Sequence, residues 1–490
     1  MALLGLVHLA LRAHGRGVPL ITDEGEYAVA ARAWSRGELP YLAAFSQKPP
    51  MTFLLYRLPW SPRATAAAFS LGVMAALFFT VPAAAPLAAR LAAPAAYASL
   101  STLPLGDYGF PANTEVFLNL FAALAVWAFS RGRAGLAGAF LGAAFMTKQT
   151  SAFVALALLA LALRLHGRAA LLRGLAGAAV VPAAFSLYFA SRHAHAAYWD
   201  AAFGGNTRYA AVLLLTGAAG SQVRWFLTSV LPSLLLYWAP ALGLLVWGLK
   251  GLVVDRRRAV ETAAVLWLGG AVAGALTGLF LFPHYFLQVA APLALCAGLG
   301  VARVSSPRAG AAAVALLALW PALLSPRLYF LASPREVAVR LLHPNPLFEV
   351  KLLGEEIARR ARPGDRLHVF GSEGALFVYS GLDPATRHTL SYAVTLFPES
   401  ARAVEEEYAS LGAGPRFLVW SCQPLSTMVS NAASRRYAER LERELLPRYR
   451  YRGKVEVTGG PPAFSPAAPG EAPDLTPGDR LLLFERPIPL

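Results

Sequence analysis

The chain has 490 residues, of which 56% are hydrophobic and only 15% are charged, and its mean hydropathy is +0.48. Soluble proteins carry about 25% charged residues, so this composition excludes an ordinary soluble protein and indicates a chain largely embedded in a lipid bilayer. The formal net charge of +16 could suggest a nucleic-acid partner. The basic residues instead lie in short clusters between apolar segments, which is the positive-inside pattern of membrane proteins, so we expect no nucleic-acid binding.

Apolar segments that could cross a bilayer recur through the first two thirds of the chain. The first, 1–11, is shorter than the roughly 20 residues that a spanning helix needs. Either this helix continues into 12–19 or the start of the chain is late, and we favour a late start. Counting this segment, we predict about eleven transmembrane helices. The other segments are 64–88, 92–106, 114–130, 134–148, 150–164, 170–190, 225–248, 260–282, 285–302 and 309–325.

A cluster of acidic residues lies between the first two apolar segments, in the stretch Thr22-Asp-Glu-Gly-Glu-Tyr27. Charges at a membrane face cost free energy if they become buried, so such a cluster is a candidate functional site. The same residues also fit a helix start, with Asp23 as the N-cap and Glu26 completing a capping box three residues later. The two interpretations are compatible, because a cap can also hold a catalytic carboxylate in place.

Basic clusters fall on every second connection between the predicted helices, which assigns those connections to the cytoplasm. The opposite face then holds the acidic stretch and most of the other polar connections, and this gathering favours a site there. The basic clusters are Arg90, Arg131 to Arg133, Arg164 to Arg173, Lys250 to Arg258 and Arg303 to Arg308. The polar connections are Gly106 to Glu115, Thr147 to Gln149, 191–224 and Pro283 to Tyr285.

From about Pro326 onward, charged residues and prolines are frequent and no twenty-residue apolar run remains. Alternating strand and helix patterns predict a small α/β domain, which lies outside the cytoplasm if the number of spans is odd. We therefore expect a membrane domain at 1–325, with its first extracytoplasmic loop at 12–63, and an extracytoplasmic domain at 326–490. Its predicted elements are strands at 366–371, 416–421 and 480–485, helices at 401–411 and 434–446, and a loop at 459–477.

Two weaker patterns exclude other functions. The turn Gly371-Ser-Glu-Gly374 lacks the spacing of a Walker or a Rossmann phosphate loop, so we do not expect it to bind a nucleotide. The two cysteines, Cys296 and Cys422, fall in a predicted membrane helix and in the C-terminal domain. We expect neither a disulfide between them nor a cysteine-based metal site.

A series of short motifs extends along the same predicted face. In order, they are Asp23-Glu-Gly-Glu-Tyr27, Gly37-Glu-Leu-Pro-Tyr41, Lys48-Pro-Pro50, Asn113-Thr-Glu-Val-Phe117, Met146-Thr-Lys-Gln149 and His284-Tyr-Phe286. Over roughly 20–300, the series resembles the GT-C superfamily of glycosyltransferases, and most closely its protein O-mannosyltransferase and lipid A aminoarabinose transferase branch. This resemblance implies a multi-pass enzyme of the cell inner (plasma) membrane. It would transfer a hexosyl or pentosyl group from a polyprenyl-phosphate carrier to a hydroxyl of a lipid, glycan or protein outside the cytoplasm.

The resemblance also implies roles for individual residues. Asp23 matches the family's catalytic acidic residue and would be the general base, Glu24 would orient the site, and Lys48 would meet the carrier phosphate. Lys48 could equally be a lysine whose stem lies along apolar surface while its ammonium group reaches water. One departure is Glu26, where aminoarabinose transferases have an arginine, and this counts against that substrate.

Four further residues have both a functional and a structural interpretation. By the resemblance, Glu115 lies near the sugar or the acceptor, while Lys148, His284 and Tyr285 lie at the phosphate. Alternatively, Glu115 is a favourable charge at a helix N-terminus, and Lys148 anchors a turn. His284 and Tyr285 would then belong to the aromatic belt of the membrane interface.

The implied reaction explains these residue types. An acceptor hydroxyl is a poor nucleophile and needs a carboxylate to take its proton. The leaving lipid phosphate needs cations in a site screened from water. Displacement by the hydroxyl inverts the anomeric carbon. A phosphate leaves without protonation, so the acid carboxylate of a glycosidase is not required. Whether a divalent metal joins the carboxylates stays open.

Two other classes of protein remain as alternatives. A transporter or flippase of envelope lipids or glycans also needs about a dozen spans, but it predicts paired broken helices near the membrane midplane. A non-catalytic envelope assembly protein would use its C-terminal domain to recruit partners. Replacement of Asp23 by Asn separates an enzyme from such a scaffold, which would tolerate the change.

Overall fold

The structure, a computed structural model, describes residues 1–249, 258–396, 400–412 and 414–487, and the chain forms two compact units. The predicted domain boundary after 325 lies near the change of unit at Val337. Residues 17–47 and 193–212, which we had assigned to the membrane domain, fold with the C-terminal part instead. The helical unit is Met1–Arg16, Lys48–Arg192 and Leu213–Val337, and the α/β unit is Gly17–Gln47, His193–Val212 and Ala338–Leu490.

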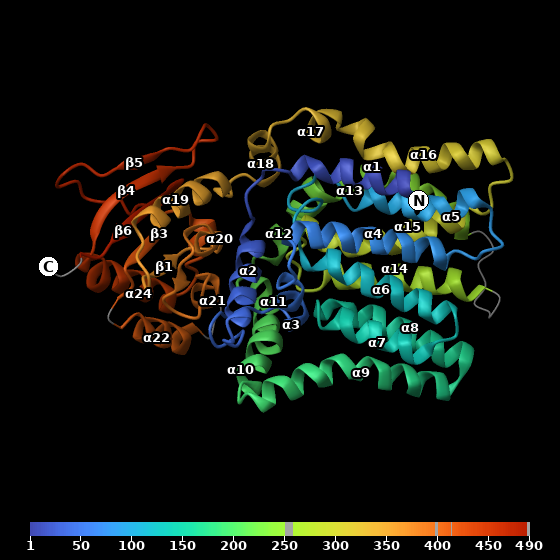
Figure 1. Cartoon of the computed structure of the whole chain (residues 1–490), viewed down its shortest axis with the longest axis horizontal. Helices are drawn as coiled ribbons and strands as arrows, with labels where there is room; N and C mark the ends of the chain where they lie inside the picture. The colour runs from blue at the N-terminus through green and yellow to red at the C-terminus, as the bar shows by residue number, and fades with distance from the viewer. Residues whose placement is uncertain (250–257, 397–399, 413, 488–490) are drawn as a thin grey trace. The chain divides into compact units, whose positions relative to one another are not determined.

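In the described part of the chain, every one of the eleven predicted apolar segments contains a helix (Figure 1). Seven helical stretches have the length and hydropathy of a membrane span. Three shorter apolar helices, α1, α6 and α7, lie among them in the described residues. The helices of this unit are α1 (Ala2–Arg12), α3 (Pro50–Tyr56), α4 (Pro62–Thr80), α5 (Leu87–Leu100), α6 (Thr114–Ser130), α7 (Ala134–Phe145), α8 (Ala152–His166), α9 (Arg168–Ser191), α12 (Ala219–Trp225), α13 (Leu231–Leu249), α14 (Ala259–Leu276), α15 (Leu287–Val301), α16 (Pro307–Leu324) and α17 (Pro326–Phe330).

Small residues allow close contact between neighbouring helices of the bundle. A Cβ atom on Gly138 of α7 would lie 2.0 Å from the Gly174 carbonyl oxygen of α9, and one on Gly177 would lie 2.0 Å from that of Gly135. Helix backbones that approach this closely are typical of membrane proteins, where association depends on van der Waals packing rather than on the hydrophobic effect.

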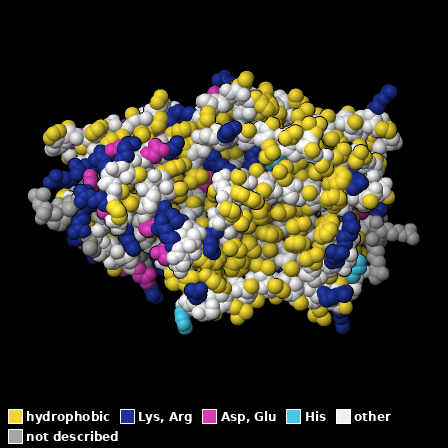
Figure 2. All heavy atoms as spheres, viewed as in Figure 1, with side chains coloured by type: hydrophobic (Ala, Val, Ile, Leu, Met, Phe, Trp, Pro, Cys, Tyr) yellow, Lys and Arg dark blue, Asp and Glu magenta, His cyan; other side chains and the backbone are white. Residues whose placement is uncertain are grey.

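The outer surface of the bundle is apolar, as a lipid-facing surface requires. Large hydrophobic side chains such as Leu156, Leu187 and Leu323 are more than 60% exposed. Figure 2 shows hydrophobic side chains covering the visible face of the helical unit. In contrast, 89% of the α15 span is buried inside the unit, so α15 is the central helix. The helical unit is therefore a polytopic membrane bundle.

Two of the turns that carry basic clusters are joined by contacts in this bundle. Arg131 donates to the carbonyl oxygen of Phe79 at 3.3 Å, and the Arg90 guanidinium lies 4.2 Å from the Phe78 ring centroid. These contacts join the connections after α4 and α6, which are alternate connections as predicted. The basic cluster at Lys250 to Arg258 lies, apart from Arg258, outside the described residues.

The α/β unit contains a six-stranded mixed sheet in the order β2-β1-β3-β6-β4-β5. β1 pairs in parallel with β2 and β3, whereas β6 runs antiparallel to both β3 and β4, and β5 is antiparallel to β4. The three predicted strands are present, but the predicted loop at 459–477 is partly wrong because β5 pairs there with β4. The strands are β1 (Arg366–Phe370), β2 (Asp383–Pro384), β3 (Phe417–Ser421), β4 (Arg450–Glu456), β5 (Phe464–Pro466) and β6 (Arg480–Glu485).

Apolar side chains from the strands and the covering helices form the core of this unit. Leu418 and Leu482 of the sheet, both 1% exposed or less, pack with Tyr437 and Leu441. The predicted helices at 401–411 and 434–446 correspond to α22 and to α24 with the turn that follows it. The helices are α2 (Thr22–Ser35), α10 (His195–Trp199), α11 (Asn206–Leu215), α18 (Pro334–Leu342), α19 (Leu347–Arg360), α20 (Ala375–Ser380), α21 (Tyr392–Thr395), α22 (Ser400–Leu411), α23 (Pro424–Thr427) and α24 (Ala432–Arg440), of which α11 and α18 cross between the two units.

Candidate active site

A buried ion pair lies where two membrane helices begin. Glu115 is the second residue of α6 and is fully buried, and its carboxylate pairs with the ammonium group of Lys148. Lys148 follows α7 at the turn that leads into α8, and its Nζ atom lies 4.0 Å from the ring centroid of Tyr285. Thr114 donates to the second oxygen of Glu115 at 3.0 Å. Glu115, Lys148 and Tyr285 therefore belong to one cluster, although the resemblance implies that Glu115 lies near the sugar or the acceptor and the other two at the phosphate.

A histidine and an aspartate extend this cluster. His284 Nδ1 lies 2.6 Å from Asp107 Oδ2, and the backbone of Asp107 is held by Asn113, whose amide donates to its carbonyl oxygen at 3.0 Å. Asp107 lies in the polar connection Gly106 to Glu115 but was not singled out as a site residue from the sequence. Its position in a Gly- and Pro-containing connection between two spans was the available signal.

Lys48 is the first residue of the second segment of the helical unit. In the sequence, this segment directly follows residues 17–47 of the α/β unit. Thr52 Oγ1 donates to the Thr147 carbonyl oxygen at 3.1 Å, and the Met51 amide donates to that of Met146 at 3.1 Å. These bonds tie the start of α3 to the turn that carries Lys148. Lys48, half-buried, also acts electrostatically on Glu115. The helical unit thus gathers two lysines and a histidine around two carboxylates.

The acidic stretch forms the first turns of α2 in the α/β unit. The predicted cap is partly wrong, because the N-cap is Ile21 and Asp23 lies inside the first turn. Glu24 supplies the cap from the N3 position, where its fully buried carboxylate accepts from the Ile21 amide at 3.1 Å. Asp23 is half-buried, and its Oδ2 atom accepts from the Tyr27 hydroxyl at 2.7 Å. Asp23 and Glu24 therefore have different surroundings.

The third acidic residue, Glu26, is 3% exposed and accepts from the Tyr392 hydroxyl at 3.3 Å. Tyr392 is distant in the sequence, and the pattern of residues around Glu26 gave no signal of this contact. Burial, followed by the nearby carboxylates of Glu26 and Asp23, raises the pKa of Tyr392 well above its usual value, so the phenol remains a hydrogen-bond donor. In the described residues, no three His, Cys, Asp or Glu side chains converge as metal ligands.

The turn Gly371–Gly374 holds a buried carboxylate rather than an open phosphate cradle. Glu373 is 5% exposed and accepts from Ser426 at 2.6 Å and from Ser421 at 3.1 Å. Burial raises the pKa of Glu373 above its ordinary value. A carboxyl group in this position disfavours an anionic ligand.

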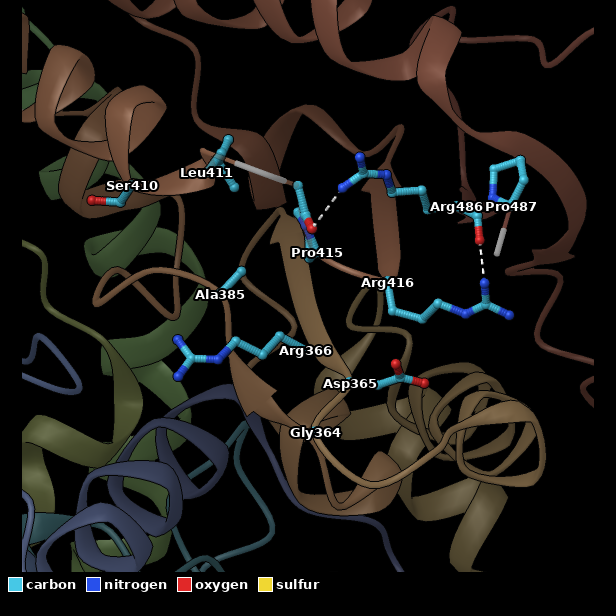
Figure 3. Close-up of a pocket in the computed structure, with 11 residues that line it drawn as sticks. Gly364, Asp365, Arg366, Ala385, Ser410, Leu411, Pro415, Arg416, Arg486 and Pro487 are labelled. Carbon is cyan, nitrogen blue, oxygen red and sulfur yellow. Dashed lines mark hydrogen bonds between the residues drawn. The ribbon is translucent and has the colours of Figure 1, made fainter. Parts of the chain in front are cut away.

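A separate pocket of about 540 Å³ opens at the amino-terminal ends of β1 and β3 (Figure 3). Figure 3 shows the guanidinium groups of Arg366 and Arg416 pointing in opposite directions. Arg416 donates to the Arg486 carbonyl oxygen and to Glu485, and Arg486 donates to the Gly414 carbonyl oxygen at 3.3 Å. Two of the three arginines are thus engaged by the chain itself, and the described lining includes none of the predicted site residues.

Comparisons with known proteins identify the fold. No protein-family model matches the chain, and no curated protein matches it by sequence. ArnT from Cupriavidus metallidurans, solved bound to undecaprenyl phosphate, matches with a TM-score of 0.55 and 16% identity, over 99% of this chain and 97% of that one. The archaeal oligosaccharyltransferase AglB from Archaeoglobus fulgidus, in complex with an inhibitory peptide and a dolichol-phosphate, matches with a TM-score of 0.53 and 11% identity, over 95% and 74%. The chain therefore has the fold of the GT-C membrane glycosyltransferases.

Proposed function

We propose that this protein is an integral membrane glycosyltransferase that moves a sugar from a polyprenyl-phosphate carrier to an acceptor hydroxyl on the extracytoplasmic face, with inversion. The observation that carries the proposal is the charged cluster at one end of an apolar bundle of GT-C fold. Lys48, Lys148 and His284 lie there with Glu115 and Asp107. Charges are costly in a membrane protein and mark a substrate site by default.

The cations of this cluster suit a lipid phosphate. A phosphate that leaves the anomeric carbon gains negative charge, and fixed cations in a poorly solvated site stabilise that charge. Glu115 holds Lys148 in one place and Asp107 holds His284, so both side chains are positioned before the substrate arrives. ArnT was solved bound to undecaprenyl phosphate and AglB in complex with a dolichol-phosphate. Both lipids support a polyprenyl phosphate as the carrier.

Asp23 is our candidate for the general base. Its carboxylate is only half-buried and is oriented by Tyr27, whereas the carboxylate of Glu24 is fully buried at the helix cap. A base must reach the acceptor proton, which favours Asp23 over Glu24. Glu24 then orients the site indirectly, because it fixes the start of the helix that carries Asp23.

The sugar is a hexose or a pentose, and the acceptor is a lipid, a glycan or a protein. Glu26, at the position where aminoarabinose transferases carry an arginine, is buried and receives the hydroxyl of Tyr392. The absence of that arginine argues against aminoarabinose as the transferred sugar.

The test compares membranes with and without the protein. Mass spectrometry of envelope lipids and glycans should show one polyprenyl-phosphate sugar accumulating and one glycosylated acceptor missing when the protein is absent. The purified protein should also bind undecaprenyl phosphate in lipid nanodiscs. Unchanged lipids and glycans, together with no undecaprenyl-phosphate binding, would overturn the proposal.

A further inference from the structure

Helix α2, which carries Asp23, is in backbone contact with helix α20 of the C-terminal sheet region. A Cβ atom on Gly25 would lie 2.3 Å from the amide nitrogen of Ala375 and 2.7 Å from the carbonyl carbon of Gly374. A Cβ on Gly374 would in turn lie 3.2 Å from the amide nitrogen of Glu26. Backbone atoms cannot rotate away as a flexible side chain can, so any larger residue at position 25 must displace one helix from the other.

Hydrogen bonds fix both ends of α2 on the same surface. At its start, the Leu20 amide donates to the Tyr379 hydroxyl at 2.8 Å. Near its end, Arg32 donates to the carbonyl oxygens of Phe377 at 2.9 Å and Leu382 at 2.5 Å. These partners lie on α20 and just after it, so one short segment of the C-terminal part contacts α2 over its full length.

Ionic contacts add to this attachment. Arg36, at the C-cap of α2, donates to both oxygens of Asp383 at 2.8 Å, and Arg32 lies 3.3 Å from the same carboxylate. In the middle of the helix, the hydroxyl of Tyr392 contacts Glu26 at 3.3 Å. The side chains of Arg36 and Asp383 are about half exposed, so both can be replaced without disturbing a core.

We propose that the segment from α20 to β2, through Gly374, Ala375 and Asp383, positions the candidate base Asp23 for the transfer reaction. Asp23 lies two residues before Gly25 on a rigid helix, so a shift of α2 moves its carboxylate by a similar amount. A misplacement of about 1 Å can reduce an enzymatic rate by about 10²-fold. The proposal rests on the assignment of Asp23 as base. It makes the C-terminal unit part of the catalytic apparatus rather than an appended domain.

The first test is Gly25→Ala in the full-length protein in nanodiscs. Turnover is followed as undecaprenyl phosphate released from a lipid extract of the source membrane, and affinity is measured with undecaprenyl phosphate alone. We expect kcat to fall by about 10²-fold or more while carrier affinity stays within about twofold of the parent protein. Gly269→Ala is the matched control, because a Cβ there would have no neighbour within 4 Å.

The second test is an exchange of charge at the half-exposed pair. Arg36→Glu and Asp383→Arg should each lower kcat by about fivefold, as expected for the loss of a partly exposed ion pair. The double variant R36E/D383R should recover most of the loss, because it restores an ion pair between the two positions. A double variant as slow as the single variants would overturn the proposal.

Asp23→Asn in the same preparation separates this proposal from the assignment of the base. If Asp23→Asn is inactive while Gly25→Ala turns over normally, Asp23 stands as the base and the positioning role is overturned. If Asp23→Asn is active, both are overturned.

Discussion

The carboxylate of Asp23 accepts a hydrogen bond from the Tyr27 hydroxyl, and Asp23 does not cap its helix. Replacement by Asn keeps the size of the side chain and an oxygen that can accept from Tyr27, so the fold should be retained. Loss of a general base should reduce turnover by about 10²–10⁴-fold. Turnover and carrier binding of purified Asp23→Asn, measured together, check this expectation.

Glu24→Gln is the matched control, because glutamine at N3 can still accept from the amide of Ile21. We expect it to keep near-normal turnover. If Glu24→Gln lost turnover while Asp23→Asn kept it, Glu24 would be the base.

The two lysines of the charged cluster should respond differently to replacement. Lys48 is half-buried at the start of a segment, so Lys48→Ala should leave the fold intact and weaken undecaprenyl-phosphate binding by roughly tenfold to a hundredfold. Lys148 is the ion-pair partner of a fully buried carboxylate. Lys148→Met should therefore destabilise the protein by about 3–5 kcal/mol, since Glu115 would remain charged and unpaired.

Thermal unfolding and carrier titration of the two lysine variants provide the measurement. The double variant K148M/E115Q should regain much of the stability without regaining carrier affinity. If Lys48→Ala kept full affinity for the carrier, Lys48 would be a lysine of the membrane interface and not a phosphate-binding residue.

The residue types at the candidate site could be predicted because the proposed reaction needs side chains of only a few kinds. Only a few side chains can bind a phosphate or accept a proton, and short motifs marked Asp23, Lys48, Glu115 and Lys148. The cap was mislocated by two residues, because Thr22, Asp23 and Glu24 all favour the first turn of a helix and only the backbone shows which one begins it. These side chains' roles in catalysis stay predictions.

At the scale of single elements, strand β1 carries a buried histidine whose protonation should weaken the α/β unit. Burial lowers the pKa of His368, Glu407 raises it and His388 lowers it, for a net decrease. Glu407 Oε1 lies 3.7 Å from His368 Nδ1, and the Tyr437 hydroxyl lies 3.4 Å from Nε2.

Because the folded pKa is below the unfolded value of 6.5, His368 contributes its full stability above pH 6.5 and loses it as the pH falls through the folded pKa. Glu373, with a raised pKa, has the opposite effect, since its stability is lost as the pH rises above 4.5. His368→Gln removes only the first contribution. The measurement is hydrogen exchange of the β1 and β3 amides between pH 7.5 and 5, corrected for intrinsic rates. The variant should lose less protection on acidification than the parent protein. An equal loss of protection would exclude His368 as the cause of the acid destabilisation.

Membrane helices were the most predictable elements, because a long apolar run has few alternatives in a bilayer. All eleven predicted segments contain a helix in the described chain, although several of these helices end before the predicted boundary. Strands β1, β3 and β6 were also predicted, since each contains several buried apolar residues. β5 was missed because its short sequence Phe464–Pro466, within a Pro- and Gly-rich stretch, becomes a strand only by pairing with β4.

At the scale of the whole molecule, local sequence patterns could not predict which chain segments make up each of the two units. The contact of Glu26 with Tyr392 joins residues separated by 366 positions. No periodicity or turn motif encodes such a pairing, because it depends on the complementary surfaces of two folded elements. The fold class, in contrast, followed from composition and from the order of motifs.

The orientation of the chain in the membrane is the prediction on which the location of the candidate base depends. Basic clusters on alternate connections predict that those connections are cytoplasmic and that the α/β unit lies outside. Alkaline phosphatase, which is active only outside the cytoplasm, should be active when fused after Leu490 and inactive when fused after Arg133, in a basic turn. A green fluorescent protein fused at the same two positions should give the opposite pattern. If instead the Leu490 fusion were fluorescent and had no phosphatase activity, the α/β unit and Asp23 with it would be cytoplasmic. An extracytoplasmic transfer reaction would then be excluded.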